Sequence, residues 1–71
     1  MIGRVRNIPD GKFFGFISDE GGRDFFFHKD DYKGSWDKLL KAFRDGEQVL
    51  VEFVPNEAPK GLRASEVVHI N

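Results

Sequence analysis

Aromatic side chains crowd two short stretches of this chain, and their spacing could place several rings on one surface. Residues 12–17 read Lys-Phe-Phe-Gly-Phe-Ile, and residues 24–28 read Asp-Phe-Phe-Phe-His. Successive side chains of a β-strand point to opposite faces, so each stretch divides its rings between two faces. A water-facing group of rings can stack on unpaired nucleic-acid bases, which is binding chemistry rather than catalysis. The residues predicted to share that face are Phe14, Phe16, Phe26 and His28.

The segment that joins the two stretches is suited to a hairpin turn. Residues 18–23 contain the pair Gly21-Gly22, and glycine adopts positive backbone angles without steric cost. The chain would then fold back on itself and place Phe25 and Phe27 on the face opposite the exposed rings. A small domain can bury only one face of such a hairpin, so Phe25 and Phe27 are expected in the core.

The two stretches resemble the paired ribonucleoprotein motifs of the cold-shock domain family. Residues 12–17 are similar to the first motif, Lys-Gly-Phe-Gly-Phe-Ile, and residues 24–28 to the second, Asp-Val-Phe-Val-His. The similarity covers nearly the whole chain apart from residues 30–44. It implies a barrel that binds pyrimidine-rich single strands and acts as an RNA chaperone in transcription or translation. Further similar segments are residues 3–6, 45–49 and 60–67.

Four positions depart from the family pattern. Asn7 stands where tryptophan is usual, Ile8 where phenylalanine is usual, Phe13 where glycine is usual, and Lys29 where phenylalanine is usual. Lys29 exchanges a stacking ring for a cation that can approach phosphate or lie over a base. Phe13 has two possible places, in the core or in the aromatic surface. The stacking surface is therefore expected to be smaller and more basic than in the family.

The distribution of charge bears on how such a surface could bind. The formal net charge is −1, which argues against binding that depends mainly on neutralising phosphates. Stacking must then contribute heavily, although a near-neutral total could still hide a basic face and an acidic back. Several basic residues lie on or beside the predicted strands. The candidate nucleic-acid-binding residues are Lys12, Phe14, Phe16, Phe26, His28, Arg6, Arg4, Lys29, Lys60 and Arg63.

Periodicity in the rest of the chain predicts strands and one helix. Residues 2–8 and 62–70 read as the first and last strands, and residues 47–54 as a fourth strand that ends at a loop over 55–61. Residues 35–44 carry apolar side chains at helical spacing. Ser35 is a suitable N-cap and Gly46 a suitable stop for this helix. The side chains expected to point inward are Val5, Val49, Val51, Phe53 and Ala64, and Trp36 is expected to pack against the barrel end.

These elements predict an all-β fold: a five-stranded antiparallel barrel of the oligonucleotide-binding (OB) type. The first three strands would form a meander, the last two would close the barrel, and the short helix would lie between the third and fourth strands. A length of 71 residues fits one small domain over residues 1–71.

Several classes of protein are disfavoured. The chain has no cysteine and no apolar run of about 18 residues, so we expect a cytoplasmic protein without disulfides or a membrane segment. We also expect a monomer. No phosphate-binding loop or acid/base couple is present, and His28, Asp30 and Asp31 lack a further ligand at metal-site spacing. We therefore expect single-stranded RNA or DNA as the partner, no enzymatic activity, no cofactor and no metal.

Two alternatives to nucleic-acid binding remain open from the sequence. The helix, with Trp36, Leu39 and Phe43, and the reduced aromatic platform could both present surfaces to a protein partner on a small barrel. The aromatic face could instead be covered by self-association. His69 has no visible partner in the sequence and is expected at the surface.

Overall fold

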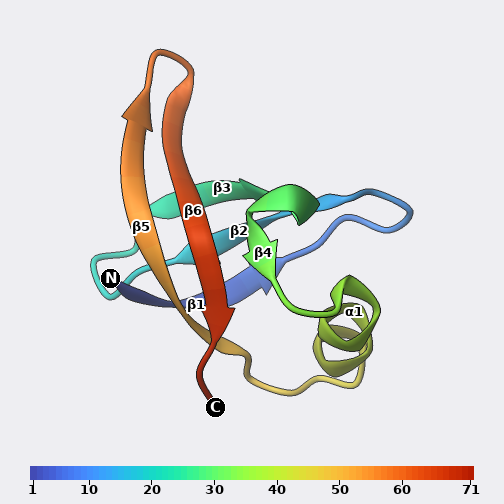
Figure 1. Ribbon diagram of the computed structural model, residues 1–71. Coiled ribbons are helices and arrows are strands. Elements are labelled where there is room, and N and C mark those ends of the chain that lie inside the picture. The colour runs from blue at the N-terminus through green and yellow to red at the C-terminus, as the bar shows by residue number, and fades with distance from the viewer.

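Six strands and one α-helix build the structure, a computed structural model that describes residues 1–71. The first half of the chain holds the strands on which the aromatic stretches lie, and the second half holds a long hairpin (Figure 1). In chain order the elements are β1 (Ile2–Asn7), β2 (Phe14–Ser18), β3 (Asp24–His28), the 3₁₀ turn η1 (Lys29–Asp31), β4 (Tyr32–Lys33), α1 (Trp36–Arg44), β5 (Leu50–Ala58) and β6 (Gly61–His69).

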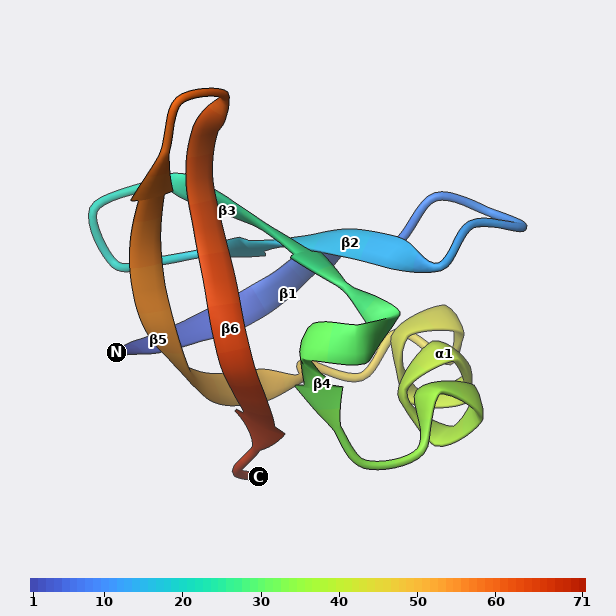
Figure 2. The same ribbon diagram turned by 45° about the horizontal axis from the view of Figure 1, so that its top comes forward.

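The strands close into the barrel that the sequence predicts. β1, β2 and β3 form an antiparallel meander, β1 also pairs with β5, and β5 pairs with β6. Figure 2 shows β5 and β6 crossing the sheet of β1 to β3. The barrel closes where Phe26 of β3 lies beside Arg63 of β6. This closing pair is parallel rather than antiparallel, because β6 returns across the meander in the direction of β3.

Two connections are more ordered than the sequence indicates. Tyr32 and Lys33, which lie between the third predicted strand and the predicted helix, form the short strand β4 parallel to β6. The predicted loop over residues 55–61 is wrong, since β5 continues to Ala58 and β6 begins at Gly61. Proline is tolerated on an edge strand, and beyond Phe53 the strand β5 pairs only with β6. Pro55 therefore lies on a free edge, and the β5–β6 hairpin projects beyond the barrel (Figure 1).

The core contains the side chains that alternation assigns to it. Gly15 lets β2 pass close to its neighbours, because a Cβ there would lie 2.7 Å from the Asn7 carbonyl oxygen and 2.9 Å from the Phe27 ring. Ile8, directly after β1, is also buried. The core consists of Val5, Ile8, Ile17, Phe25, Phe27, Trp36, Leu39, Val49, Val51, Phe53, Ala64 and Val67.

The helix α1 closes one end of the barrel, and its predicted caps are confirmed. The Ser35 hydroxyl accepts a hydrogen bond from the Lys38 N–H at 3.3 Å, and Gly46 has a φ of 81° just beyond the helix. An ion pair of 2.9 Å joins Arg44 at the end of α1 to Asp10 in the β1–β2 connection. No helix in the structure has the length and apolar character needed to cross a membrane.

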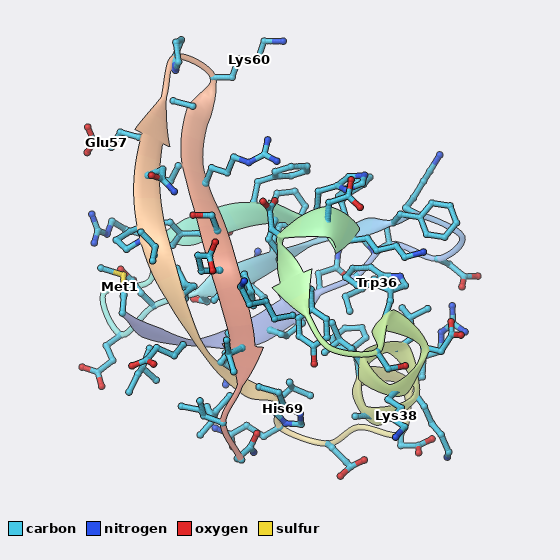
Figure 3. The ribbon with its side chains drawn as sticks, viewed as in Figure 1. Met1, Trp36, Lys38, Glu57, Lys60 and His69 are labelled. Atoms are coloured by element: carbon cyan, nitrogen blue, oxygen red, sulfur yellow. The ribbon has the colours of Figure 1, made fainter.

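Trp36, the only tryptophan, is packed into the barrel end as predicted (Figure 3). Its side chain is 5% exposed, and its ring lies 5.8 Å from that of Phe27 and 6.2 Å from that of Tyr32. Its ring N–H has no hydrogen-bond partner, so apolar packing holds the indole in place.

We expect the fluorescence of Trp36 to be blue-shifted and insensitive to nucleic acid, because a buried indole cannot stack on a base. Titration with oligo-dT, and with iodide as a soluble quencher, measures this directly. Strong quenching by both would contradict the packing of Trp36 against Phe27 and Tyr32.

Candidate nucleic-acid interface

Three phenylalanine rings gather on the outer face of β2 and β3. Phe16 lies opposite Phe26 in the strand register, and Phe14 lies opposite His28. The ring centroids of Phe14 and Phe26 are 5.4 Å apart, and Phe16 lies 6.0 Å from each of the other two rings. We call Phe14, Phe16, Phe26 and His28 the aromatic platform. The structure thus brings together the four side chains that the sequence assigns to one face.

Burial separates this platform from the core. Phe25 and Phe27 are 1% and 0% exposed, whereas the four platform residues are only partly buried. Each platform ring is therefore held by its neighbours and still presents surface to water. Rings that are already positioned lose little side-chain entropy when a base stacks on them.

His28 is oriented by hydrogen bonds from the 3₁₀ turn that follows it. The Asp30 N–H donates to Nδ1 of the ring at 3.1 Å, and the His28 N–H donates to the Asp31 carboxylate at 2.9 Å. Since Nδ1 accepts a hydrogen bond, we assign the ring hydrogen to Nε2. That N–H makes no hydrogen bond within the protein and is available to a ligand.

Two arginines flank the platform, and both are paired with carboxylates. The Arg63 guanidinium lies 5.4 Å from the centroid of the Phe26 ring and 3.0 Å from the Asp31 carboxylate. Arg6 pairs with Asp24 at 2.9 Å. The expected separation of a basic face from an acidic back is thus incomplete, because Asp24 and Asp31 neutralise charge beside the rings.

A groove extends the platform beneath the β5–β6 hairpin. It has a volume of about 530 Å³ and is lined by Phe16, Phe26 and residues 58–63. Figure 3 shows Lys60 at the tip of this hairpin. Leu62, which sequence reasoning did not assign to the site, contributes an apolar wall. No local signal placed Leu62 beside Phe16, since the groove arises only from barrel closure.

The remaining basic candidates and Phe13, whose place the sequence left open, occupy three different places. Lys12, Lys29 and Lys60 are exposed and take part in none of the ion pairs of the structure. Phe13 lies outside the core, because β2 begins only at Phe14. Arg4 does not join the platform: it lies opposite Ser18 at the far end of β2 and borders a separate hollow with Asp19 and Glu20.

The β2–β3 turn is stabilised by two hydrogen bonds from Arg23 to the Asp19 carboxylate. The Arg23 N–H donates to the Asp19 carboxylate at 2.8 Å, and the Arg23 guanidinium donates to it at 2.9 Å. These bonds, the backbone one foremost, hold the pKa of Asp19 below its usual value. A lowered pKa stabilises the fold above the pKa of the unfolded chain, and this contribution is lost as the pH falls through the folded-state pKa.

No group of three or more histidine, cysteine, aspartate or glutamate side chains is arranged to hold a metal ion. Apart from the paired carboxylates of Asp24 and Asp31, the polar groups of the site are hydrogen-bond donors and cations around apolar rings. Such an arrangement supports recognition of bases and phosphates.

Comparison with known proteins agrees with this geometry. Residues 1–70 match the family described as "'Cold-shock' DNA-binding domain". Cold shock protein CapB of Pseudomonas syringae pv. tomato is 35% identical over 67 residues, which cover 94% of this chain and 90% of the relative. Major cold shock protein CspA of Pseudomonas aeruginosa is 38% identical over 65 residues, 92% of this chain and 87% of the relative.

Cold shock protein CspD of Bacillus subtilis is 38% identical over 68 residues, 96% of each chain. The barrel, the two aromatic motifs and these similarities show that the chain belongs to the cold-shock domain family, a family of nucleic-acid-binding proteins.

Proposed function

We propose that this protein binds single-stranded RNA or DNA by stacking unpaired bases on the aromatic platform. The observation that carries the proposal is the set of three mutually packed phenylalanine rings that remain partly exposed. Base stacking on such rings contributes about 1–3 kcal/mol per base, and every base offers a π-face. The expected sequence preference is therefore weak.

Basic side chains would meet the phosphates of the bound strand. Lys60 and Arg63 border the groove, and Arg6 lies at its edge with Phe16 and Phe26. Arg4 would be reached only by a strand that continues along β1 toward Ser18. The proposed binding residues are Lys12, Phe14, Phe16, Phe26, His28, Arg6, Arg4, Lys29, Lys60 and Arg63.

Stacking on exposed rings also supports a role as an RNA chaperone. A base inside a duplex has no free π-face, so a protein that binds only unpaired bases shifts a folded RNA toward its melted state. The relatives are named cold shock proteins, which is consistent with such a role. We propose that one domain over residues 1–71 does this as a cytoplasmic monomer, without enzymatic activity.

The protein-partner alternative loses one of its two surfaces. Trp36 and Leu39, which could have faced a partner from the helix, are 5% and 1% exposed and belong to the core. Phe43 is only partly exposed and packs against the core, so the platform is the main surface left for such a partner.

Binding of labelled oligo-dT, a duplex of equal length and an unrelated peptide separates these functions. We expect binding of the single strand alone, with amide shifts concentrated in β2, β3 and the β5–β6 hairpin. Affinity should fall only modestly with salt, because Arg6 and Arg63 are already paired and few counterions are released.

Fluorescence anisotropy at several salt concentrations and amide spectra of the labelled protein provide these measurements. Equal affinity for the duplex, or peptide binding with shifts on the same strands, would contradict the proposal.

A further inference from the structure

We propose that Phe13 and Lys29 form an additional base-binding subsite at the edge of the aromatic platform. It would take one more unpaired base of the bound strand, beside the base that stacks on Phe14. This inference rests on the proposed function, since it needs a single strand on the platform.

The position of Phe13 supports this subsite. Phe13 is 58% exposed, the highest value among the exposed large hydrophobic residues of the chain. Exposure alone carries little weight, because single apolar residues are common on protein surfaces. The backbone adds the decisive point: the Lys29 N–H donates to the Phe13 carbonyl oxygen at 2.7 Å. This bond lies directly beyond the pairing of Phe14 with His28, so Phe13 and Lys29 adjoin the platform at the ends of β2 and β3. Phe13 precedes β2, so strand alternation does not turn its side chain into the core, and its ring stays exposed.

Lys29 gives the exposed ring its ionic partner. Its ammonium nitrogen lies 5.2 Å from the centroid of the Phe13 ring, within the range of a cation–π contact. Lys29 forms no ion pair with a carboxylate, so its charge is not committed elsewhere in the protein. A base on Phe13 would bring its phosphate near this ammonium. The pair thus combines the two elements of single-strand binding, a π-surface and a neighbouring cation.

The subsite distinguishes this chain from the motifs that it resembles. Both Phe13 and Lys29 depart from the family pattern, and the structure shows that they are cross-strand neighbours. The ring that the family usually carries directly after the histidine is replaced by Lys29 in this chain, and Phe13 provides a ring directly before Phe14 instead. The stacking surface extends from β2 rather than from β3 at this end.

A walk of abasic nucleotides along the strand tests the subsite. A series of oligo-dT strands of about seven nucleotides, a length within the site sizes of OB folds, is made with a single abasic nucleotide at a different position in each strand. Each strand is titrated against the parent protein and against Phe13→Ala. We expect Phe13→Ala to weaken binding of the intact strand about five- to tenfold, the lower part of the range for one stacked base. One abasic position near a strand end should weaken the parent by the same factor and leave the variant unchanged.

Matched variants separate the effect of stacking from that of losing apolar side-chain volume. Phe13→Leu keeps an apolar side chain without a π-face and should behave like Phe13→Ala. Ile70→Ala, which truncates a side chain that is 47% exposed outside the platform, should bind like the parent. Phe13→Trp should place an exposed indole whose fluorescence is quenched by oligo-dT. Lys29→Gln should reduce the slope of log affinity against log salt by about 0.7.

The outcomes distinguish the subsite from the platform. The subsite is wrong, while the platform stands, if Phe13→Ala binds every strand as tightly as the parent does. The same conclusion follows if the affinity of Phe13→Ala is lower than that of the parent by one constant factor, whichever position is abasic. If no abasic position weakens the parent, base stacking itself fails, and the platform and the subsite fall together.

Discussion

Phe25→Ala and Phe27→Ala should each lower the free energy of unfolding by about 3–5 kcal/mol. Both side chains are essentially inaccessible to water. Phe25 packs with its ring 5.0 Å from that of Phe53, and Phe27 packs against Trp36. Removing either ring leaves a cavity that a barrel cannot easily collapse. Small domains have total stabilities of roughly 5–15 kcal/mol, so each variant should be close to unfolding. Urea denaturation followed by far-UV circular dichroism measures the loss.

Phe26→Ala is the matched control for this prediction, because Phe26 lies between the two core rings in the sequence. Its ring already faces water in part, and its truncation should destabilise the fold much less. A loss for Phe26→Ala equal to that for Phe25→Ala would contradict the assignment of the two faces of β3.

Phe16→Ala and Phe26→Ala should each weaken binding of single-stranded oligonucleotide by about 1–3 kcal/mol while the protein stays folded. Both rings border the groove beneath the β5–β6 hairpin, so each variant removes stacking surface at the centre of the proposed interface. Isothermal titration with oligo-dT gives the affinities, and circular dichroism confirms the fold.

Lys12→Ala serves as the comparison for charge. It should cost less affinity than loss of a ring and should slightly flatten the salt dependence, because one phosphate contact releases about one counterion. If the two phenylalanine variants stay folded and bind as tightly as the parent, the stacking mechanism is wrong. A protein partner on the platform then becomes the leading function.

Alternation along the strands determined which phenylalanines face the core. The backbone of a strand sends neighbouring side chains to opposite faces, so Phe25 and Phe27 were separable from Phe26 without a structure. The helix was also predictable from local signals, because its apolar spacing, the Ser35 cap and the stop at Gly46 all lie close together in the chain. Local chemistry was enough wherever the partner of a residue lay nearby in the chain.

Pro55 was a misleading local signal. Pro55 predicted the end of the fourth strand, yet β5 continues past it. Whether proline breaks a strand depends on which edge has a hydrogen-bond partner, and pairing of β5 with β1 ends before Pro55. The projecting hairpin, and the groove beneath it, could not be predicted from residues 55–61 alone.

The sequence by itself determined the two faces of the aromatic hairpin and the short helix, because each depends on periodicity or on contacts a few residues apart. It indicated the barrel class through strand periodicity together with the resemblance of its motifs to a known family. Only the tertiary structure decided that Arg63 reaches Phe26 and Asp31, that Arg4 lies away from the platform, and that Phe13 stays outside the core. These features follow from where β6 closes on β3 and where β2 begins. Both depend on long-range pairing, which local side-chain patterns do not encode.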